Sequence, residues 1–506
     1  QYNTALGAEA LTNNTTASSN TAVGYQSLYT NTTGASLSAV GVGALYANTT
    51  GSNNVAMGTS SLVSNTTGAS NTGLGRDALR SNTTASNNTA VGHQAAYNNT
   101  TGTENTTLGR VSLLTNTTGN ENTAIGSVAL YYNTTGSNNV AVGRQALNNN
   151  TTASNNTAVG FQALLANTTG TANTAIGRNS LQANTTADDN TASGMYSLYT
   201  NTTGASNTAH GRSALFSNTT GSSNVSVGAQ ALENNTTAGN NVAVGYQAGF
   251  SNTTGAQNTM LGNTAGRSAT TGSYSTFLGR DSGYYITTGT KNVILGSYNG
   301  NQGSLDIRTS NSNIVLSDGD GNPRIHVDSN GKTFVGPENT NNATFHVHSL
   351  SNYWTAILYN LSNSDVTNVL CRHHWATGSN TATQISFRQS NGNEVGSIKS
   401  NGSSTSYNTS SDYRLKENVD YTWDATTRLK QLKPARFNFI ADADTTVDGF
   451  LAHEAQAVVP ECVTGAKDAV DADGNAVMQG IDQSKLVPLL VKTIQELEAR
   501  ITALEG

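Results

Sequence analysis

Hydrophobic residues are sparse in the N-terminal part of the chain and recur with a fixed period of 17 residues. From Asn3 the sequence reads NTALGAEALTNNTTASS, then NTAVGYQSLYTNTTGAS, and it continues in this way to NVILGSYNGNQG at Asn292, which makes eighteen copies. The fourth position of a copy is aliphatic, with Ser193 and His210 as exceptions, and the fifth is always glycine. Repetition with a period of this length indicates stacked, nearly identical structural units.

Each copy predicts one coil of a β-solenoid. The segment NTAVG is a short strand whose second and fourth side chains share a face, which we expect to point inward, and the glycine allows a tight turn. The ninth position, usually leucine, supplies another inward anchor, although glycine replaces it in the last four copies, at Gly249, Gly266, Gly283 and Gly300. Fifteen copies carry NTT from the twelfth position, which is typical of an outer turn. The absence of 3.6-residue spacing argues against a helix.

Eighteen coils spaced about 4.8 Å apart would form a rod of roughly 85 Å, and each coil buries its face only against its neighbours. The NTT rows have alternative interpretations. Asn-Thr-Thr is an acceptor pattern for glycosylation, and rows of threonine on a flat solenoid are a candidate ice-binding surface, whereas a rigid spacer is the plainer explanation. His210, in a slot expected to face inward, is either a metal ligand or a tolerated polar substitution.

The 17-residue period stops near residue 309 and gives way to alternating strands. SNIVLSDGDGNPRIHVDSNGKTFVG predicts a hairpin with turns at DGDGNP and DSNG. Asp318 and Asp320 resemble the start of a calcium loop, but Ser329 stands where such a loop needs its twelfth-position glutamate. We therefore predict a small β-rich domain over residues 309–410.

This middle segment offers only weak candidates for binding sites. It contains two pairs of histidines: His346, His348, His373 and His374. Zinc needs three or four ligands at fixed spacing, which these residues do not provide, so we expect no metal and no other cofactor. A receptor-binding patch, if the segment has one, is expected on the loops 362–365 and 377–383.

From residue 411 the sequence has the mixed composition of an ordinary globular protein, and we place a third domain over residues 411–506. WDATTRLKQLKPARFNF predicts a helix ended near Pro434 and followed by a strand, and GFLAHEAQAVVPECV predicts a short helix closed by Pro460. DADGNAVMQGID predicts a hairpin around Gly474. The last stretch predicts a helix capped by Ser484, with a coiled-coil seam for trimer assembly. The seam residues are spaced 3-4-3-4-3: Val487, Leu490, Ile494, Leu497, Ile501 and Leu504.

Composition and charge narrow the classes of function. Only 35% of the 506 residues are hydrophobic and 11% are charged, which favours a thin repetitive architecture over a compact enzyme. The net charge of −6 arises within residues 411–506, which hold 10 Lys+Arg and 16 Asp+Glu. No basic patch indicates a nucleic-acid partner, and no apolar run suits membrane insertion. Cys371 and Cys462 lie in different segments and indicate no disulfide scaffold. Because the chain starts at Gln1, we expect a processed or excerpted product.

The N-terminal repeats resemble the head repeats of YadA-type trimeric adhesins, in which an NSVAIG strand motif builds a left-handed β-roll in a three-chain bundle. The repeat here is longer than is usual in that family, so the resemblance concerns motif and architecture rather than register. It implies a mainly β fold with a trimeric left-handed β-roll, or β-solenoid, shaft over residues 1–308. The sparse aliphatic residues would then be shared among three chains.

The C-terminal segment resembles a second family. SDYRLKENV, LKPARFNF, GFLAHEAQAVVPE and GIDQSKLVPLLVKTIQELEARI, in that order, are similar to the intramolecular chaperone of phage endosialidases and tail fibres, a self-cleaving peptidase family. Val419 and His453 depart mildly from its pattern. The resemblance implies an α+β chaperone domain that trimerises the fibre during folding. It then cuts itself off with a serine–lysine dyad, Ser411 and Lys416, at the bond between Ser410 and Ser411.

The residue types suit this chemistry. Ser411 Oγ lies next to the carbonyl of its own preceding peptide bond, so the attack has the full benefit of proximity, but the hydroxyl needs a base to take its proton. Lysine acts as a base only when burial or a neighbouring charge lowers its pKa, and we expect trimerisation to provide the burial. Asp412 and Arg414 are expected to orient the loop or pair across chains. His453 and Glu454 are further candidate supporting residues.

These features predict a homotrimeric phage tail fibre or similar virion appendage, located on the virion tail and involved in host attachment. Its expected partners are the remainder of the virion tail and a host-surface receptor, either a glycan or a surface protein. The alternative is a bacterial trimeric adhesin with a phage-like chaperone, located at the bacterial cell surface. Autocleavage is the only chemistry we expect, because no activity on external substrates is visible; a polysaccharide hydrolase within the repeats is a third hypothesis.

Overall fold

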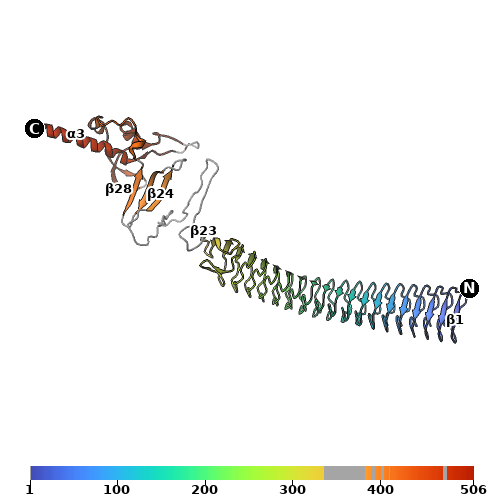
Figure 1. The fold of residues 1–506 in the computed structure, drawn as a ribbon. Coiled ribbons are helices and arrows are strands. Elements are labelled where there is room, and N and C mark those ends of the chain that lie inside the picture. Colours follow the sequence, from blue (N-terminus) through green and yellow to red (C-terminus); the bar gives the residue numbers. More distant parts are fainter. Residues whose placement is uncertain are drawn as a thin grey trace. The chain divides into compact units, whose positions relative to one another are not determined.

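The computed structural model describes residues 2–335, 382–388, 394–400, 404–409, 411–440, 442–470, 474 and 476–506. The chain forms two compact units, Gln1–Thr355 and Ala356–Gly506. The first contains a β-solenoid, drawn in Figure 1 as a row of similar coils, and the second is a small α+β unit. Several predictions fall outside the described residues: the four histidines of the middle segment, the loop 362–365 and most of the loop 377–383, Cys371 and Ser410.

Each coil of the solenoid contributes one three-residue strand, formed by positions two to four of its repeat (Figure 1). Successive strands pair in parallel, with equivalent repeat positions opposite each other, as Thr4 and Thr21 are. This uniform register confirms the predicted β-solenoid with a 17-residue period. The strands are β1 (Thr4–Leu6), β2 (Thr21–Val23), β3 (Ser38–Val40), β4 (Val55–Met57), β5 (Thr72–Leu74), β6 (Thr89–Val91), β7 (Thr106–Leu108), β8 (Thr123–Ile125), β9 (Val140–Val142), β10 (Thr157–Val159), β11 (Thr174–Ile176), β12 (Thr191–Ser193), β13 (Thr208–His210), β14 (Val225–Val227), β15 (Val242–Val244), β16 (Thr259–Leu261), β17 (Thr276–Leu278) and β18 (Val293–Leu295).

The third repeat position, not the fourth, faces the interior of the coil. Ala158 is fully buried, whereas Ile176 at the fourth position of the next coil is 45% exposed. The prediction of an inward fourth position is therefore wrong, and His210 is exposed on the outer face rather than held in an inward slot. The strand alternation is as expected, but its phase is shifted by one residue. The narrow coil has room for a small side chain opposite the inward leucine, so the larger aliphatic residue lies outside.

Large and small core residues exchange positions in the last coils. Where glycine replaces leucine at the ninth position, the third position of nearby coils changes from alanine to Met260 or Phe277, both fully or almost fully buried. A Cβ atom added to Gly283 would lie 2.8 Å from Cδ1 of Phe277, and one added to Gly266 would lie 2.7 Å from Sδ of Met260. The glycines thus make room for larger residues at the third position, which keeps the interior close-packed.

Buried asparagines form a ladder along the solenoid at the twelfth repeat position. Asn133 is fully buried, and its Nδ2 donates to Oδ1 of Asn116 at 2.8 Å and to the carbonyl of Gly136 at 2.9 Å. This amide nitrogen is therefore inaccessible to glycan attachment in the folded coil. The first threonine of each NTT is also used internally, since Thr134 Oγ1 donates to the carbonyl of Thr151 in the next coil. The NTT motif thus has a structural explanation as hydrogen-bonded corner chemistry.

The solenoid sheet continues past the last regular coil. The short strands β19 (Asn301–Gln302) and β20 (Leu305–Asp306) pair with each other, and β21 (Ile314–Ser317) pairs in parallel with β18. β21 then forms the predicted hairpin with β22 (Pro323–Val327), which pairs with β23 (Thr333–Val335). In the first turn, hydrogen bonds from Asn322 and Arg324 lower the pKa of Asp318 to about 2. This carboxylate is thus satisfied by its own hairpin, as the hairpin interpretation predicts.

The second unit begins with an antiparallel sheet and continues into the helical C-terminal segment. The helices on either side of the strand after Pro434 confirm the predicted order, and Val470 pairs with Ala476 around Gly474. The elements are β24 (Ala382–Arg388), β25 (Glu394–Ser400), β26 (Thr405–Thr409), η1 (Tyr413–Leu415), α1 (Ala425–Leu429), β27 (Ala435–Phe439), β28 (Asp442–Gly449), α2 (Ala452–Val458), η2 (Pro460–Cys462), β29 (Val463–Thr464), β30 (Gly480–Ile481), η3 (Gln483–Leu486) and α3 (Val487–Glu505).

The start of the last helix differs from the prediction. Asp482, not Ser484, is the capping residue, and it caps the 3-10 turn η3, whereas α3 itself has no side-chain cap. Oδ1 of Asp482 accepts hydrogen bonds from the backbone nitrogen of Ser484 at 3.0 Å and from its hydroxyl at 2.6 Å. The 3-10 turn η3 precedes α3 and moves the capping position back along the chain. Pro488 lies in the first turn of α3 and lacks an N–H group, which removes one donor that a cap would otherwise satisfy.

Candidate functional site

The predicted dyad lies on a single tight turn at the start of the chaperone-like segment. The 3-10 helix η1 reverses the chain between Ser411 and Lys416, with the backbone nitrogen of Lys416 donating to the carbonyl of Tyr413 at 3.1 Å. This reversal brings the lysine amine back to the serine. Nζ of Lys416 donates a hydrogen bond to Oγ of Ser411 at 2.7 Å. The predicted nucleophile and base are thus within the reach that general-base catalysis requires.

Asp412 and Arg414 hold this turn together. The Asp412 carboxylate accepts from the backbone nitrogen of Arg414 and from its Nε, both at 2.9 Å, and from its Nη2 at 2.8 Å. The bidentate pair lowers the pKa of the Asp412 carboxyl and raises the pKa of the Arg414 guanidinium. Neither residue contacts the Ser411 hydroxyl through these bonds. The arrangement agrees with an orienting role within the loop rather than a catalytic one.

The other candidate supporting residues lie on α2 and do not join the dyad. Glu454 pairs with Lys433 at 3.5 Å, and no hydrogen bond among the described residues links Glu454 or His453 to Ser411 or Lys416. The dyad itself is exposed in the single chain. A buried environment for the pair must therefore come from outside the described part of this chain.

The predicted coiled-coil seam lies along one side of α3 and is exposed. The least exposed of its six residues, Leu497, still has 43% of its surface accessible, and Leu504 has 88%. Figure 1 shows the C-terminal part of α3 extending beyond the rest of its unit. An apolar stripe that none of the described residues covers is what an interhelical seam requires.

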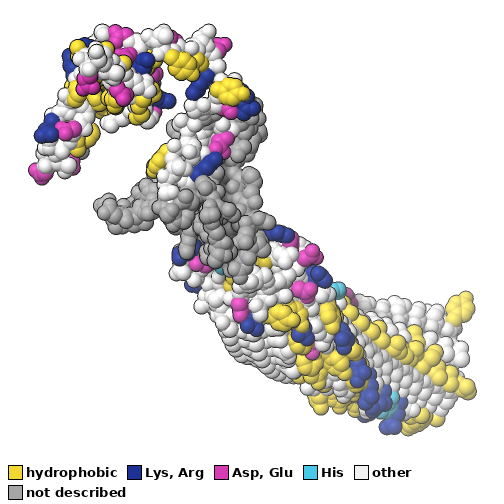
Figure 2. Space-filling view, turned by 60° about the vertical axis from the view of Figure 1, so that its left-hand side comes forward, with side chains coloured by type: hydrophobic (Ala, Val, Ile, Leu, Met, Phe, Trp, Pro, Cys, Tyr) yellow, Lys and Arg dark blue, Asp and Glu magenta, His cyan; other side chains and the backbone are white. Residues whose placement is uncertain are grey.

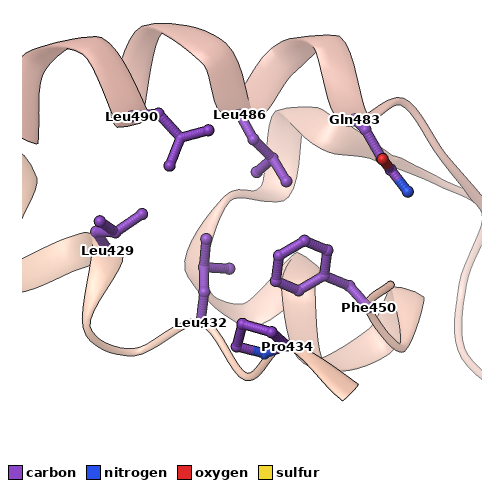
Figure 3. Close-up of a pocket in the computed structure, with 7 residues that line it drawn as sticks. All are labelled: Leu429, Leu432, Pro434, Phe450, Gln483, Leu486 and Leu490. Atoms are coloured by element: carbon purple, nitrogen blue, oxygen red, sulfur yellow. The ribbon is translucent and has the colours of Figure 1, made fainter. Parts of the chain in front are cut away.

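The seam begins at the edge of an apolar pocket in the second unit (Figure 3). Leu490 belongs to the seam and also points toward Leu429 and Leu432 across this pocket. The pocket has a volume of about 360 Å³ and is lined by Leu429, Leu432, Pro434, Phe450, Gln483, Leu486 and Leu490. The apolar surface of the seam therefore continues into the core of the unit.

One contact that fixes α3 carries no signal in the sequence. The carboxylate of Glu496, in the middle of α3, accepts hydrogen bonds from the backbone nitrogens of Ala425 at 3.0 Å and Thr426 at 2.8 Å, and from the hydroxyl of Thr426 at 2.6 Å. Glu496 thereby caps the N-terminus of α1 from a position about seventy residues away. Local motifs cannot reveal a cap that is supplied by another helix.

The outer face of the solenoid sheet carries a second uncovered apolar row. In every coil except those of Ser193 and His210, the fourth repeat position places an aliphatic side chain on this face, among them Leu108 with 49% and Leu261 with 43% of its surface exposed. Since the coils stack in register, these side chains form a line along the sheet that is interrupted only at Ser193 and His210. Exposed apolar rows of this length mark surfaces for association.

Comparison with known proteins finds a similarity in the C-terminal segment. Residues 411–464 match the family model described as "Chaperone of endosialidase", and the match begins at Ser411. No curated protein and no solved structure matches the chain. None of the helices in the described part of the chain is long and apolar enough to cross a membrane. A chaperone of this family behind a β-solenoid shaft fits a tail-fibre-like protein, and this family implies an extracellular or virion-associated fibre.

Proposed function

We propose that this protein is a homotrimeric tail fibre, or a similar virion appendage, that attaches the virion to a host surface. Its C-terminal chaperone assembles the three chains and then cuts itself off between Ser410 and Ser411. The observation that carries this proposal is the family match beginning at Ser411, at the residue whose hydroxyl lies 2.7 Å from the Lys416 amine. The shaft is the β-solenoid, and the chaperone is residues 411–506.

The cleavage proceeds in two steps, transfer of the Ser410 acyl group to the Ser411 hydroxyl and hydrolysis of the resulting ester. The amine of Lys416 removes the hydroxyl proton of Ser411, and Oγ attacks the carbonyl carbon of Ser410. The C–N bond breaks, the proton passes to the departing nitrogen of Ser411, and the two residues are now joined by an ester. Water then hydrolyses this ester, which leaves a carboxylate on Ser410 and restores the hydroxyl of Ser411. The reaction requires no external substrate or cofactor.

Two uncovered apolar rows support a three-chain assembly. The fourth-position aliphatic residues line the sheet face, and the seam lines α3. Burial of apolar surface contributes about 25 cal/mol per Å², so covering both rows with further copies stabilises the assembly. Assembly would also enclose the exposed dyad, which couples cutting to the correct number of chains.

Intact mass spectrometry of the purified full-length chain tests the proposal. We expect the wild-type protein of 52.4 kDa to yield two fragments, residues 1–410 and 411–506. Ser411→Ala and Lys416→Ala should each leave the chain intact and still trimeric by light scattering. Lys433→Ala is the matched control, since this lysine lies in the same segment and pairs with Glu454 instead, and it should cleave normally.

Three results would contradict the proposal. If the wild-type chain is monomeric, the assembly role is wrong. If Lys416→Ala cleaves like the wild type, Lys416 is not the base. If Lys416→Ala prevents trimer formation, assembly by the chaperone fold and cleavage by the dyad are not separate roles.

A further inference from the structure

The arginines of the solenoid are confined to one side of the coils. Every arginine between Arg76 and Arg280 stands at position six or ten of its repeat, just past the glycine corner that ends the sheet face. Figure 2 shows arginine side chains in a line along the solenoid, with hydrophobic side chains beside it. Within residues 105–223 the acidic residues Glu121, Asp188 and Asp189 all stand at positions 16 and 17 instead. This stretch of the arginine side therefore has no acid of its own.

Four of these arginines occupy position six of every second coil: Arg110, Arg144, Arg178 and Arg212. Because two coils rise roughly 9.6 Å, the four form an evenly spaced row about 29 Å long. All four are exposed, and none of them pairs with a carboxylate within the described part of the chain. Arg76, which lies before this row, does pair with Asp77 at 3.2 Å. The row thus presents four available guanidinium groups at a constant interval.

Aromatic rings lie between the arginines of this row. Cζ of Arg144 and Cζ of Arg178 both lie 5.9 Å from the ring centre of Phe161, and Arg178 lies 5.9 Å from the ring centre of Tyr196 as well. Such cation–π contacts hold the guanidinium groups of Arg144 and Arg178 against a ring and leave N–H groups at their edges. The two central arginines of the row are therefore positioned by side chains of neighbouring coils.

Side-chain amides run beside the rings at position seven. Nε2 of Gln162 donates to Oε1 of Gln145 at 3.0 Å, and Nδ2 of Asn179 donates to Oε1 of Gln162 at 3.1 Å. Each amide group keeps additional donor or acceptor capacity for a ligand. We call the whole surface the arginine–aromatic stripe, defined by Arg110, Arg144, Phe161, Arg178, Tyr196 and Arg212.

We propose that the arginine–aromatic stripe binds a linear acidic polysaccharide that lies along the solenoid. Guanidinium groups bind carboxylates in bidentate fashion, aromatic rings pack against the apolar faces of sugars, and amides bond to hydroxyl groups. One arginine per roughly 9.6 Å suits a polymer with one carboxylate for every two sugar rings. A nucleic acid carries a phosphate on every nucleotide, so this sparse row suits it less. The inference rests on the proposed attachment function and names the chemistry of the receptor.

Binding measurements on the purified protein, expressed as the full chain, test this inference. The probes are hyaluronate, which has one carboxylate per disaccharide, polygalacturonate, which has one per ring, neutral dextran and single-stranded poly(dT). We expect hyaluronate to bind most tightly, with an affinity that falls as salt rises. The triple variant R110Q/R144Q/R178Q should bind hyaluronate roughly tenfold more weakly, because exposed charge pairs each contribute a modest factor.

The matched control changes the opposite corner of the same three coils. The exposed second threonines of their NTT motifs are Thr118, Thr152 and Thr186, and T118Q/T152Q/T186Q should bind hyaluronate as the wild type does. Light scattering and intact mass are recorded for every variant. These readouts separate the inference from the proposed function, because a chain that trimerises and cleaves but ignores both acidic polysaccharides overturns only the inference.

Three further results would overturn it. Equal or tighter binding of poly(dT) would make the surface a nucleic-acid site. Equal weakening in the threonine control would show that the arginines are not the contact. Loss of the trimer in the arginine variant would mean that the stripe packs against another copy of the chain.

Discussion

The asparagine ladder at position twelve makes a quantitative prediction about solenoid stability. In Asn133→Ala, the coil loses the two bonds donated by Nδ2 and the bond that Oδ1 accepts from Nδ2 of Asn150 at 2.8 Å. Oδ1 of Asn116 is then left buried without that donor. Three lost bonds at about 1 kcal/mol each, with an added penalty for the unsatisfied acceptor, give a destabilisation of roughly 3–5 kcal/mol.

The measurement must resolve single coils, because a stack of repeats does not unfold as one simple two-state unit. Native-state hydrogen exchange of the backbone amides in the mutated coil and its two neighbours reports the local opening free energy. Thr135→Ala is the control, since this threonine lies two residues away at the same corner and is exposed. We expect the control to change stability by less than about 0.5 kcal/mol.

Asn133→Asp tests the direction in which the destabilisation changes with pH. A carboxyl in this buried slot should have a raised pKa in the folded state, because burial disfavours the charged form. The unfolded chain binds its proton with a pKa near 3.9, so the added cost is small below that pH and grows as the pH rises above it. If Asn133→Ala costs no more than the threonine control, or if the aspartate variant is equally stable at pH 3.5 and pH 7, the ladder does not stabilise the coil.

Two further predictions concern the core and the second unit. Gly283→Leu should destabilise the last coils, because a Cβ atom at this position lies 2.8 Å from Cδ1 of Phe277. Phe277→Ala should destabilise them by leaving a cavity that costs about 3–5 kcal/mol. The double variant restores the alanine–leucine pair of earlier coils and should recover most of the loss in thermal melting. Glu496→Gln should lower the melting temperature of the helical signal at pH 7. The hydrogen bond from Thr426 lowers the pKa of Glu496 in the folded protein. The stabilisation by the Glu496 carboxylate is therefore present above the pKa of the unfolded chain, near 4.3, and is lost as the pH falls through the pKa of the folded state. The Gln variant should lack this pH dependence.

The repeat period predicted the solenoid, but not which side of its strand faces inward. Alternation places the second and fourth positions on one face, and only the interior width of the coil decides which face is buried. The leucines of the ninth position determine how much room is left in the interior, because they fill it from a backbone conformation with φ near +50°, as at Leu164 (φ +51°). This left-handed conformation is uncommon for leucine, so local propensity does not predict it.

The closeness of Ser411 and Lys416 was easier to predict than the contacts of the elements around them. Ser411 and Lys416 are five residues apart, and one capped turn is enough to bring them together. Glu496 was missed because it caps α1 from another helix, and such a contact depends on tertiary placement. Ser484 was assigned the role of Asp482 for a local reason, because the 3-10 turn η3 starts the helical segment two residues earlier than the sequence pattern indicates.

The uniformity of the coils explains why a trimeric fibre built from them would need a separate unit that sets the register between the chains. Every coil presents nearly the same outer sheet face, so two shafts displaced by one or more whole repeats would cover their apolar rows almost as well as two aligned ones. The repeats alone therefore carry little information about register between chains. The C-terminal unit occurs once per chain, and in the proposed trimer the pairing of three copies through α3 would fix a single register before the shafts close. Under the same proposal, the closed shafts would retain that register through their own buried surface, so the C-terminal unit would no longer be needed and could be removed by cleavage.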